Sequence, residues 1–117
     1  MDFEQLQKDV ERLEKFLPEV REGKGPALKD FAGALRDVLS ALLKDRREHI
    51  RPGQIFRDAA AKGLVPGDIA PRGDALLVRW TGKVVPQDGA AVKEDASRWT
   101  AVAEKVLPVL KSYRKKD

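Results

Sequence analysis

Residues 26–43 read PALKDFAGALRDVLSALL. Apolar residues recur in this segment at steps of three and four, which is the period of one helix face. Pro26 suits the first helical position, because the amide hydrogen bond that proline lacks is not needed there. We predict a helix that begins here, forms the centre of the core, runs on through residues 44–49 and stops near residues 51–53. Its buried side would consist of Leu28, Phe31, Ala32, Leu35, Val38, Leu39, Leu42 and Leu43.

An earlier helix is predicted over residues 2–20, with Pro18 expected to kink or stop it. Its apolar residues keep a strict heptad pattern for nearly three repeats. Such a stripe is typical of a helix packed on its own core, and also of the seam of a helical dimer. The sequence leaves both open, and a homodimer would pair through Phe3, Leu6, Val10, Leu13 and Leu17.

In the second half of the chain, two further helices are predicted, with a strand-like segment between them. A short helix is predicted over residues 53–62, ended by Gly63 in a left-handed conformation, and a long one over residues 90–115. Turn signals occur at residues 66–68 and 71–74. Residues 75–80 read ALLVRW and alternate in the manner of a strand, and residues 83–85 follow a Thr-Gly turn as a second strand.

The predicted fold class is therefore α+β and mostly helical. About four helices would surround one core, with a two-stranded β-hairpin between the third and fourth helices. With 117 residues the chain has the length of a single domain, residues 1–117, and can bury a core without disulfides or metals.

The residue inventory argues against catalysis. There is no cysteine and a single histidine, His49, which lies among arginines at a predicted helix end. No glycine-rich phosphate loop occurs, and acidic pairs such as Glu94 and Asp95 suggest solvated helix faces. We predict no catalytic residue, no metal site and no cofactor, and therefore no enzyme.

Composition also bears on the compartment. No apolar run approaches the roughly 18 residues of a membrane span, and the chain begins with charged residues unlike a secretory signal. We expect a cytoplasmic protein with no membrane partner. The high charged fraction, 36%, together with the lack of cysteine, resembles thermophile proteins.

Basic and aromatic residues cluster around the predicted hairpin. Cations that follow phosphates, beside an aromatic ring that stacks on a base, are typical of single-strand binding. Trp80 shares a strand face with Leu76 and Val78, so a place in the core remains open for it. We predict a nucleic-acid-binding surface of Arg72, Arg79, Trp80 and Lys83, extended by Arg46, Arg47 and Arg51 from the end of the second helix.

The net charge of +4 is moderate, and the 53–62 helix has few cations for reading a duplex groove. The function predicted first is thus a non-catalytic nucleic-acid-binding protein of low sequence specificity, with single-stranded DNA or RNA favoured over duplex. The alternative is a helical protein–protein interaction module or small subunit of a larger assembly, pairing through the N-terminal helix.

Overall fold

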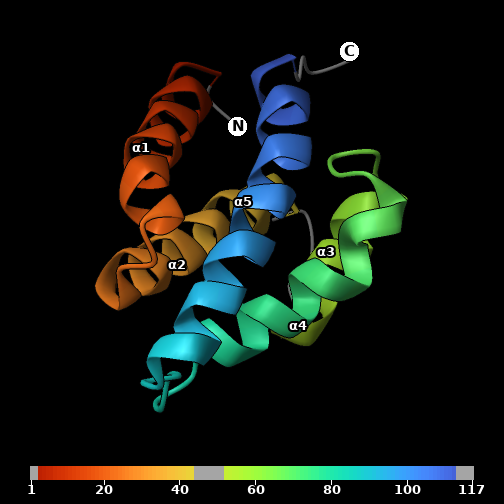
Figure 1. Ribbon diagram of the computed structural model, residues 1–117. Coiled ribbons are helices and arrows are strands. Elements are labelled where there is room, and N and C mark those ends of the chain that lie inside the picture. Colours follow the sequence, from red (N-terminus) through yellow and green to blue (C-terminus); the bar gives the residue numbers. More distant parts are fainter. Residues whose placement is uncertain (1–2, 44–51, 113–117) are drawn as a thin grey trace.

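The computed structural model describes residues 3–43 and 52–112, and the regular structure in these two ranges is entirely helical (Figure 1). Five α-helices follow one another, and a short 3₁₀ turn, η1, precedes the fourth. Their bounds are α1 Phe3–Arg21, α2 Gly25–Leu42, α3 Pro52–Ala61, η1 Gly67–Ile69, α4 Ala70–Thr81 and α5 Gly89–Ser112.

Helix α2 is the central element, as its apolar period predicts. It contacts α1, α3, α4 and α5. Its buried side includes Phe31, Leu35 and Leu39, and the ring of Phe31 meets Trp99 of α5 edge-on at 5.5 Å between centroids. The helix ends at Leu42, where the amide of Leu43 donates to the carbonyls of Leu39 and Ser40. The predicted continuation through residues 44–49 lies outside the described residues, and at the predicted stop near 51–53 the next helix, α3, begins at Pro52.

Helix α1 confirms the predicted N-terminal helix and directs its stripe inward. Leu6, Val10 and Leu13 are buried and Leu17 is partly buried, where α1 packs against α2 and α5. The prediction that Pro18 could stop this helix is wrong, because α1 continues to Arg21. Burial of the following valine, Val20, offsets the hydrogen bond that the proline removes.

The predicted β-hairpin is wrong, and with it the α+β class: the described residues form an all-helical fold. Residues 75–80 belong to α4, and residues 83–85 lie in the connection to α5. The alternation of side-chain type in residues 75–80 covers too few residues to distinguish a strand from a helix. Over the longer segment 70–81, the buried positions follow the helical period. Buried residues there are Ala70, Gly73, Asp74, Leu76, Leu77 and Trp80.

The sequence signals before and at the start of α4 gave one correct prediction and one wrong one. Gly63 has φ +75°, which confirms the predicted left-handed end of α3. The signal at residues 71–74 was misread as a turn, because Pro71 lies in the first turn of α4, a position that proline favours at helix starts.

The helices are arranged as two contacting pairs joined through α5. Helices α1 and α2 form one pair, α3 and α4 the other, and α5 lies along α1 and reaches across to α4 (Figure 1). Buried apolar residues from all five helices form one cluster. In the two described ranges, no helix is both long and apolar enough to cross a membrane.

Candidate functional site

Trp80, predicted as a stacking platform, lies in the core instead. Its side chain is fully buried on the inner face of α4. The indole Nε1–H donates to Oδ2 of Asp95 on α5 at 2.8 Å. No ring face is therefore available to a base, and the role of Trp80 is to join α4 to α5.

Asp95 is the centre of a buried polar cluster. The Nη1 group of Arg79 donates to both carboxylate oxygens, at 2.8 and 3.0 Å, and Nη1 of Arg98 donates to Oδ1 at 2.8 Å. Burial alone would raise the pKa of Asp95. The hydrogen bonds from Trp80, Arg79 and Arg98 outweigh burial, so this pKa lies below the ordinary aspartate value.

The two arginines of this cluster reach the surface. About half of each side chain is exposed, 48% for Arg79 and 45% for Arg98. A guanidinium has five N–H donors, and the bonds to Asp95 use only the inner ones. Arg98 also lies 3.7 Å from the exposed carboxylate of Glu94. The arrangement thus holds two half-exposed cations in place through their bonds to Asp95.

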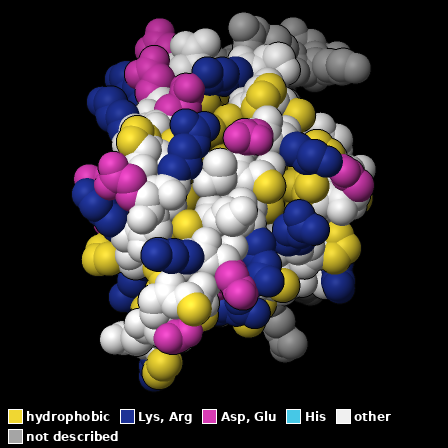
Figure 2. All heavy atoms as spheres, viewed as in Figure 1, with side chains coloured by type: hydrophobic (Ala, Val, Ile, Leu, Met, Phe, Trp, Pro, Cys, Tyr) yellow, Lys and Arg dark blue, Asp and Glu magenta, His cyan; other side chains and the backbone are white. Residues whose placement is uncertain are grey.

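Two other predicted residues lie near these arginines. Arg72 is exposed in the first half of α4, and because it precedes Arg79 by seven residues, both lie on one face of the helix. Lys83 is exposed just after α4 ends. Figure 2 shows Lys and Arg side chains gathered over α4 and the adjoining part of α5. Arg46, Arg47 and Arg51 lie outside the described residues.

Sequence reasoning missed Asp95 and Arg98. Asp95 was interpreted as part of a solvated face, which is wrong, since its side chain is fully buried. A signal was present: Asp95 falls between Val92 and Trp99 on the apolar stripe of α5. An acidic residue in such a stripe indicates a buried partner, because an unpaired buried charge is costly.

A second buried carboxylate, Asp74, holds α3 against α4. Its oxygens accept the backbone amides of Phe56 at 2.7 Å and of Arg57 at 3.1 Å. Burial raises the pKa of Asp74 above the ordinary value, although these two hydrogen bonds act against it. Next to it, Gly73 faces the ring of Phe56, and a Cβ there would come within 2.6 Å of Phe56 Cγ. Both residues thus serve helix packing.

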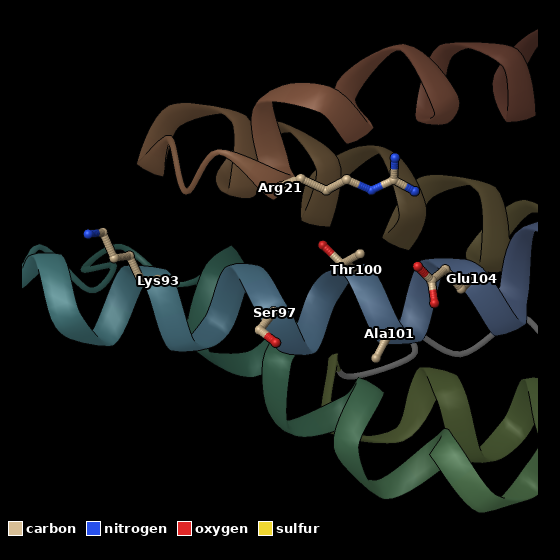
Figure 3. Close-up of a pocket in the computed structure, with 6 residues that line it drawn as sticks. All are labelled: Arg21, Lys93, Ser97, Thr100, Ala101 and Glu104. Atoms are coloured by element: carbon tan, nitrogen blue, oxygen red, sulfur yellow. The ribbon is translucent and has the colours of Figure 1, made fainter.

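A shallow groove of about 440 Å³ lies between the end of α1 and α5 (Figure 3). Arg21 reaches from α1 toward Thr100 and Glu104, and Lys93 lies at the far end. The hydroxyl of Thr100 donates to the carbonyl of Ala96 at 2.8 Å, so its proton is engaged in the helix. The groove juxtaposes the opposite charges of Arg21 and Glu104.

A larger pocket of about 640 Å³ adjoins this groove at Lys93. It lies where the start of α2, the connection 82–88 and the start of α5 meet. Lys29 and Lys93 contribute its cations, and its apolar walls are valines and prolines. In residues 3–43 and 52–112, no cluster of three or more histidines and carboxylates is placed to hold a metal ion.

No protein family, no characterised protein and no solved structure matches this chain.

Proposed function

We propose that this protein binds nucleic acid through its phosphates, without catalysis and with low sequence specificity. The contact would be made by a surface that we call the α4–α5 basic surface, formed by Arg72, Arg79, Lys83 and Arg98. The observation that carries the proposal is the fixing of Arg79 and Arg98 on the buried carboxylate of Asp95.

Fixed arginines suit phosphate binding for an entropic reason. A free arginine loses about 2 kcal/mol of rotamer freedom when it is immobilised, and part of that loss is already incurred here in folding. The outward N–H groups of Arg79 and Arg98 can then donate to phosphate oxygens, as guanidinium groups commonly do. Two carboxylates, Asp95 and Glu94, pair with Arg79 and Arg98, whereas Arg72 and Lys83 add two further positive charges, so the net charge of the α4–α5 basic surface is positive.

The α4–α5 basic surface suits single strands and duplexes equally. The preference for single strands depended on a base stacking on Trp80, and Trp80 is buried. Phosphate contacts do not require an unpaired base, so they serve single strands and duplexes alike. Low sequence specificity follows from the same reasoning, since contacts to phosphates do not distinguish bases. We assign this activity to the cytoplasm, in keeping with the absence of cysteine.

A titration with labelled single-stranded and double-stranded oligonucleotides tests the proposal. We expect binding at about 50 mM salt that weakens steeply toward 200 mM, because bound cations release counterions from the phosphates. The variant Arg72→Gln/Lys83→Gln should bind about tenfold more weakly, since a lost phosphate contact removes part of the electrostatic free energy. Neither residue forms an ion pair with a described residue, so the fold should be unaffected.

The matched control is Lys8→Gln/Lys15→Gln, which removes two exposed charges from α1. It alters the net charge of the protein by the same amount but leaves the α4–α5 basic surface intact. Absence of binding at low salt would refute the proposal. An equal loss in both double variants would show that the overall charge, and not this surface, is responsible.

A further inference from the structure

The pocket of about 640 Å³ has mainly apolar walls and a positively charged rim. Pro26, Val85, Pro86 and Val92 supply apolar surface, and Gln87 adds one amide. Pockets of this size enclose most of a small organic molecule, and mainly apolar walls with a few polar groups are typical of them. The volume is thus sufficient for a ligand with an apolar body.

The charge at the rim is entirely positive. Lys29 and Lys93 line the pocket and no acidic residue does. Neither lysine forms an ion pair within the part of the chain that the structure describes, whereas nearby Lys24 is paired with Glu22 at 3.2 Å. The stem of Lys93 lies close to Gly23, because a Cβ on that glycine would be 3.6 Å from Lys93 Cγ. Two ammonium groups are therefore left to attract an anion.

We infer that this pocket is a binding site for a small amphipathic anion, a carboxylate joined to an apolar body. The carboxylate would lie between Lys29 and Lys93, and the apolar body would contact Val85, Pro86 and Val92. A cationic ligand is disfavoured by the rim. An unstacked base is disfavoured too, because Trp80, the aromatic residue that lines the pocket, is fully buried and exposes no ring face.

Glycines at the pocket wall allow the space itself to be tested. Gly89 lines the pocket, and a Cβ built on it meets no atom within 4 Å. A leucine there would occupy open space without forcing the backbone to move, and it suits a helix better than glycine. The same holds for Gly33 on α2, which is outside the pocket and has no atom within 4 Å of its Cβ position. Gly89→Leu and Gly33→Leu are therefore a matched pair.

The binding experiment uses the full chain and decanoate as the probe, near neutral pH. Calorimetry measures decanoate directly, with decanol and decyltrimethylammonium as neutral and cationic analogues of the same chain length. We expect decanoate to bind more tightly than either analogue, since only decanoate complements the two lysines. Displacement of anilinonaphthalene sulfonate, an anion that fluoresces in apolar sites, provides a second readout.

Variants then locate the site. Lys29→Gln/Lys93→Gln should weaken decanoate about tenfold, the effect of losing two partly exposed charge contacts, and leave decanol unchanged. The control Lys8→Gln/Lys15→Gln should leave decanoate unchanged. Gly89→Leu should weaken both decanoate and decanol because it occupies the pocket, whereas Gly33→Leu should bind as the parent protein does.

Three results would overturn the inference. They are the absence of decanoate binding at millimolar concentration, equal affinity for decanoate and decanol, and equal losses in the two lysine double variants. None of the residues tested belongs to the α4–α5 basic surface. The inference therefore stands or falls independently of nucleic-acid binding.

Discussion

The indole N–H of Trp80 and the carboxylate of Asp95 form a 2.8 Å hydrogen bond between α4 and α5, with both side chains fully buried. Trp80 supplies a donor that is out of reach of water, and Asp95 uses it as one of three side-chain partners. A buried carboxylate is tolerated only when such partners satisfy it. The pair thus connects the helix packing to the two arginines at the surface.

Asp95→Asn should destabilise the fold by about 3 kcal/mol, which is typical when one partner of a buried charged network is removed. The amide would place N–H donors opposite the donors of Arg79 and Trp80, and one negative charge would be lost. Urea unfolding followed by circular dichroism measures the change. The control Glu94→Gln alters an exposed neighbour and should cost less than about 0.5 kcal/mol. Equal costs would contradict the assignment of Asp95 as the buried centre.

The two buried carboxylates should give opposite dependences on pH. The pKa of Asp95 is lowered in the fold, so its stabilising contribution is present above the unfolded value of about 3.9 and is lost as pH falls through the folded pKa. The pKa of Asp74 is raised, because burial outweighs its two amide hydrogen bonds. Its contribution is present below the unfolded value and is lost as pH rises through the folded pKa.

Unfolding free energies measured from about pH 3 to about pH 7 can separate these contributions, since that range spans ordinary carboxyl titration. The advantage of the parent protein over Asp95→Asn should grow as pH rises. Its advantage over Asp74→Asn should shrink over the same range. Parallel curves for the two variants would show that one of the pKa directions is wrong.

Exchange of each tryptophan for phenylalanine should separate hydrogen bonding from packing. Trp80 and Trp99 are both fully buried, but only Trp80 has a partner for its indole nitrogen among the described residues. Both variants lose similar volume, and Trp80→Phe also leaves Asp95 with one donor fewer. We therefore expect Trp80→Phe to be the more destabilising by about 1.5–3 kcal/mol, the value of a hydrogen bond to a charged group. Equal losses in thermal unfolding would count against this bond.

Residues 70–81 show where sequence reasoning succeeded and where it failed. Long helices with a clear period, such as α1 and α2, were predictable because many apolar positions agree. The period of α4 was obscured by a buried aspartate, Asp74, and a buried glycine, Gly73, at positions where an apolar residue would have marked the helix. Both residues are required by contacts with Phe56, which lies 17 positions before Gly73 and 18 before Asp74. A pattern within residues 70–81 does not reveal contacts with so distant a residue.

The candidate site was only partly predictable for the same reason. Arg79 and Arg72 were found because exposed arginines are visible in the sequence. Arg98 was missed because its link to Arg79 passes through Asp95. Asp95 lies 16 residues after Arg79 and three before Arg98, and no sequence pattern marks such a set of residues as one network. The place of Trp80 stayed open in the sequence, since on the predicted strand it shared a face with Leu76 and Val78, which suits the core as well as a stacking surface; the structure buries it.

Gly73→Ala should destabilise the protein although alanine favours helices. The new Cβ would overlap the ring of Phe56, which is fully buried and has no room to move. Overpacking of this kind costs about 1–3 kcal/mol, and it exceeds the gain of up to about 1 kcal/mol from helix propensity. Gly33→Ala is the control: its Cβ enters open space in α2, so it should stabilise. Chemical unfolding of both variants should give shifts of opposite sign.

The apolar stripe of α1 faces the core of its own chain. The homodimer predicted through the α1 stripe would need Leu6, Val10 and Leu13, which α1 buries against α2 and α5. Among described residues, the large apolar side chains left exposed are Val78 and Val84. We therefore expect a monomer in light scattering at high concentration. A dimer that dissociates in Leu13→Ser, without loss of monomer helicity, would restore the predicted seam.

The close contact at Gly73 and Asp74 also has a mechanical consequence. The ring of Phe56 against Gly73 fixes the separation of α3 and α4, and the two amides bound to Asp74 fix their relative rotation and sliding. The two helices should thus move as one rigid body. Hydrogen exchange in α3 and α4 should then proceed through a shared opening, with protection that rises and falls together when either helix is perturbed.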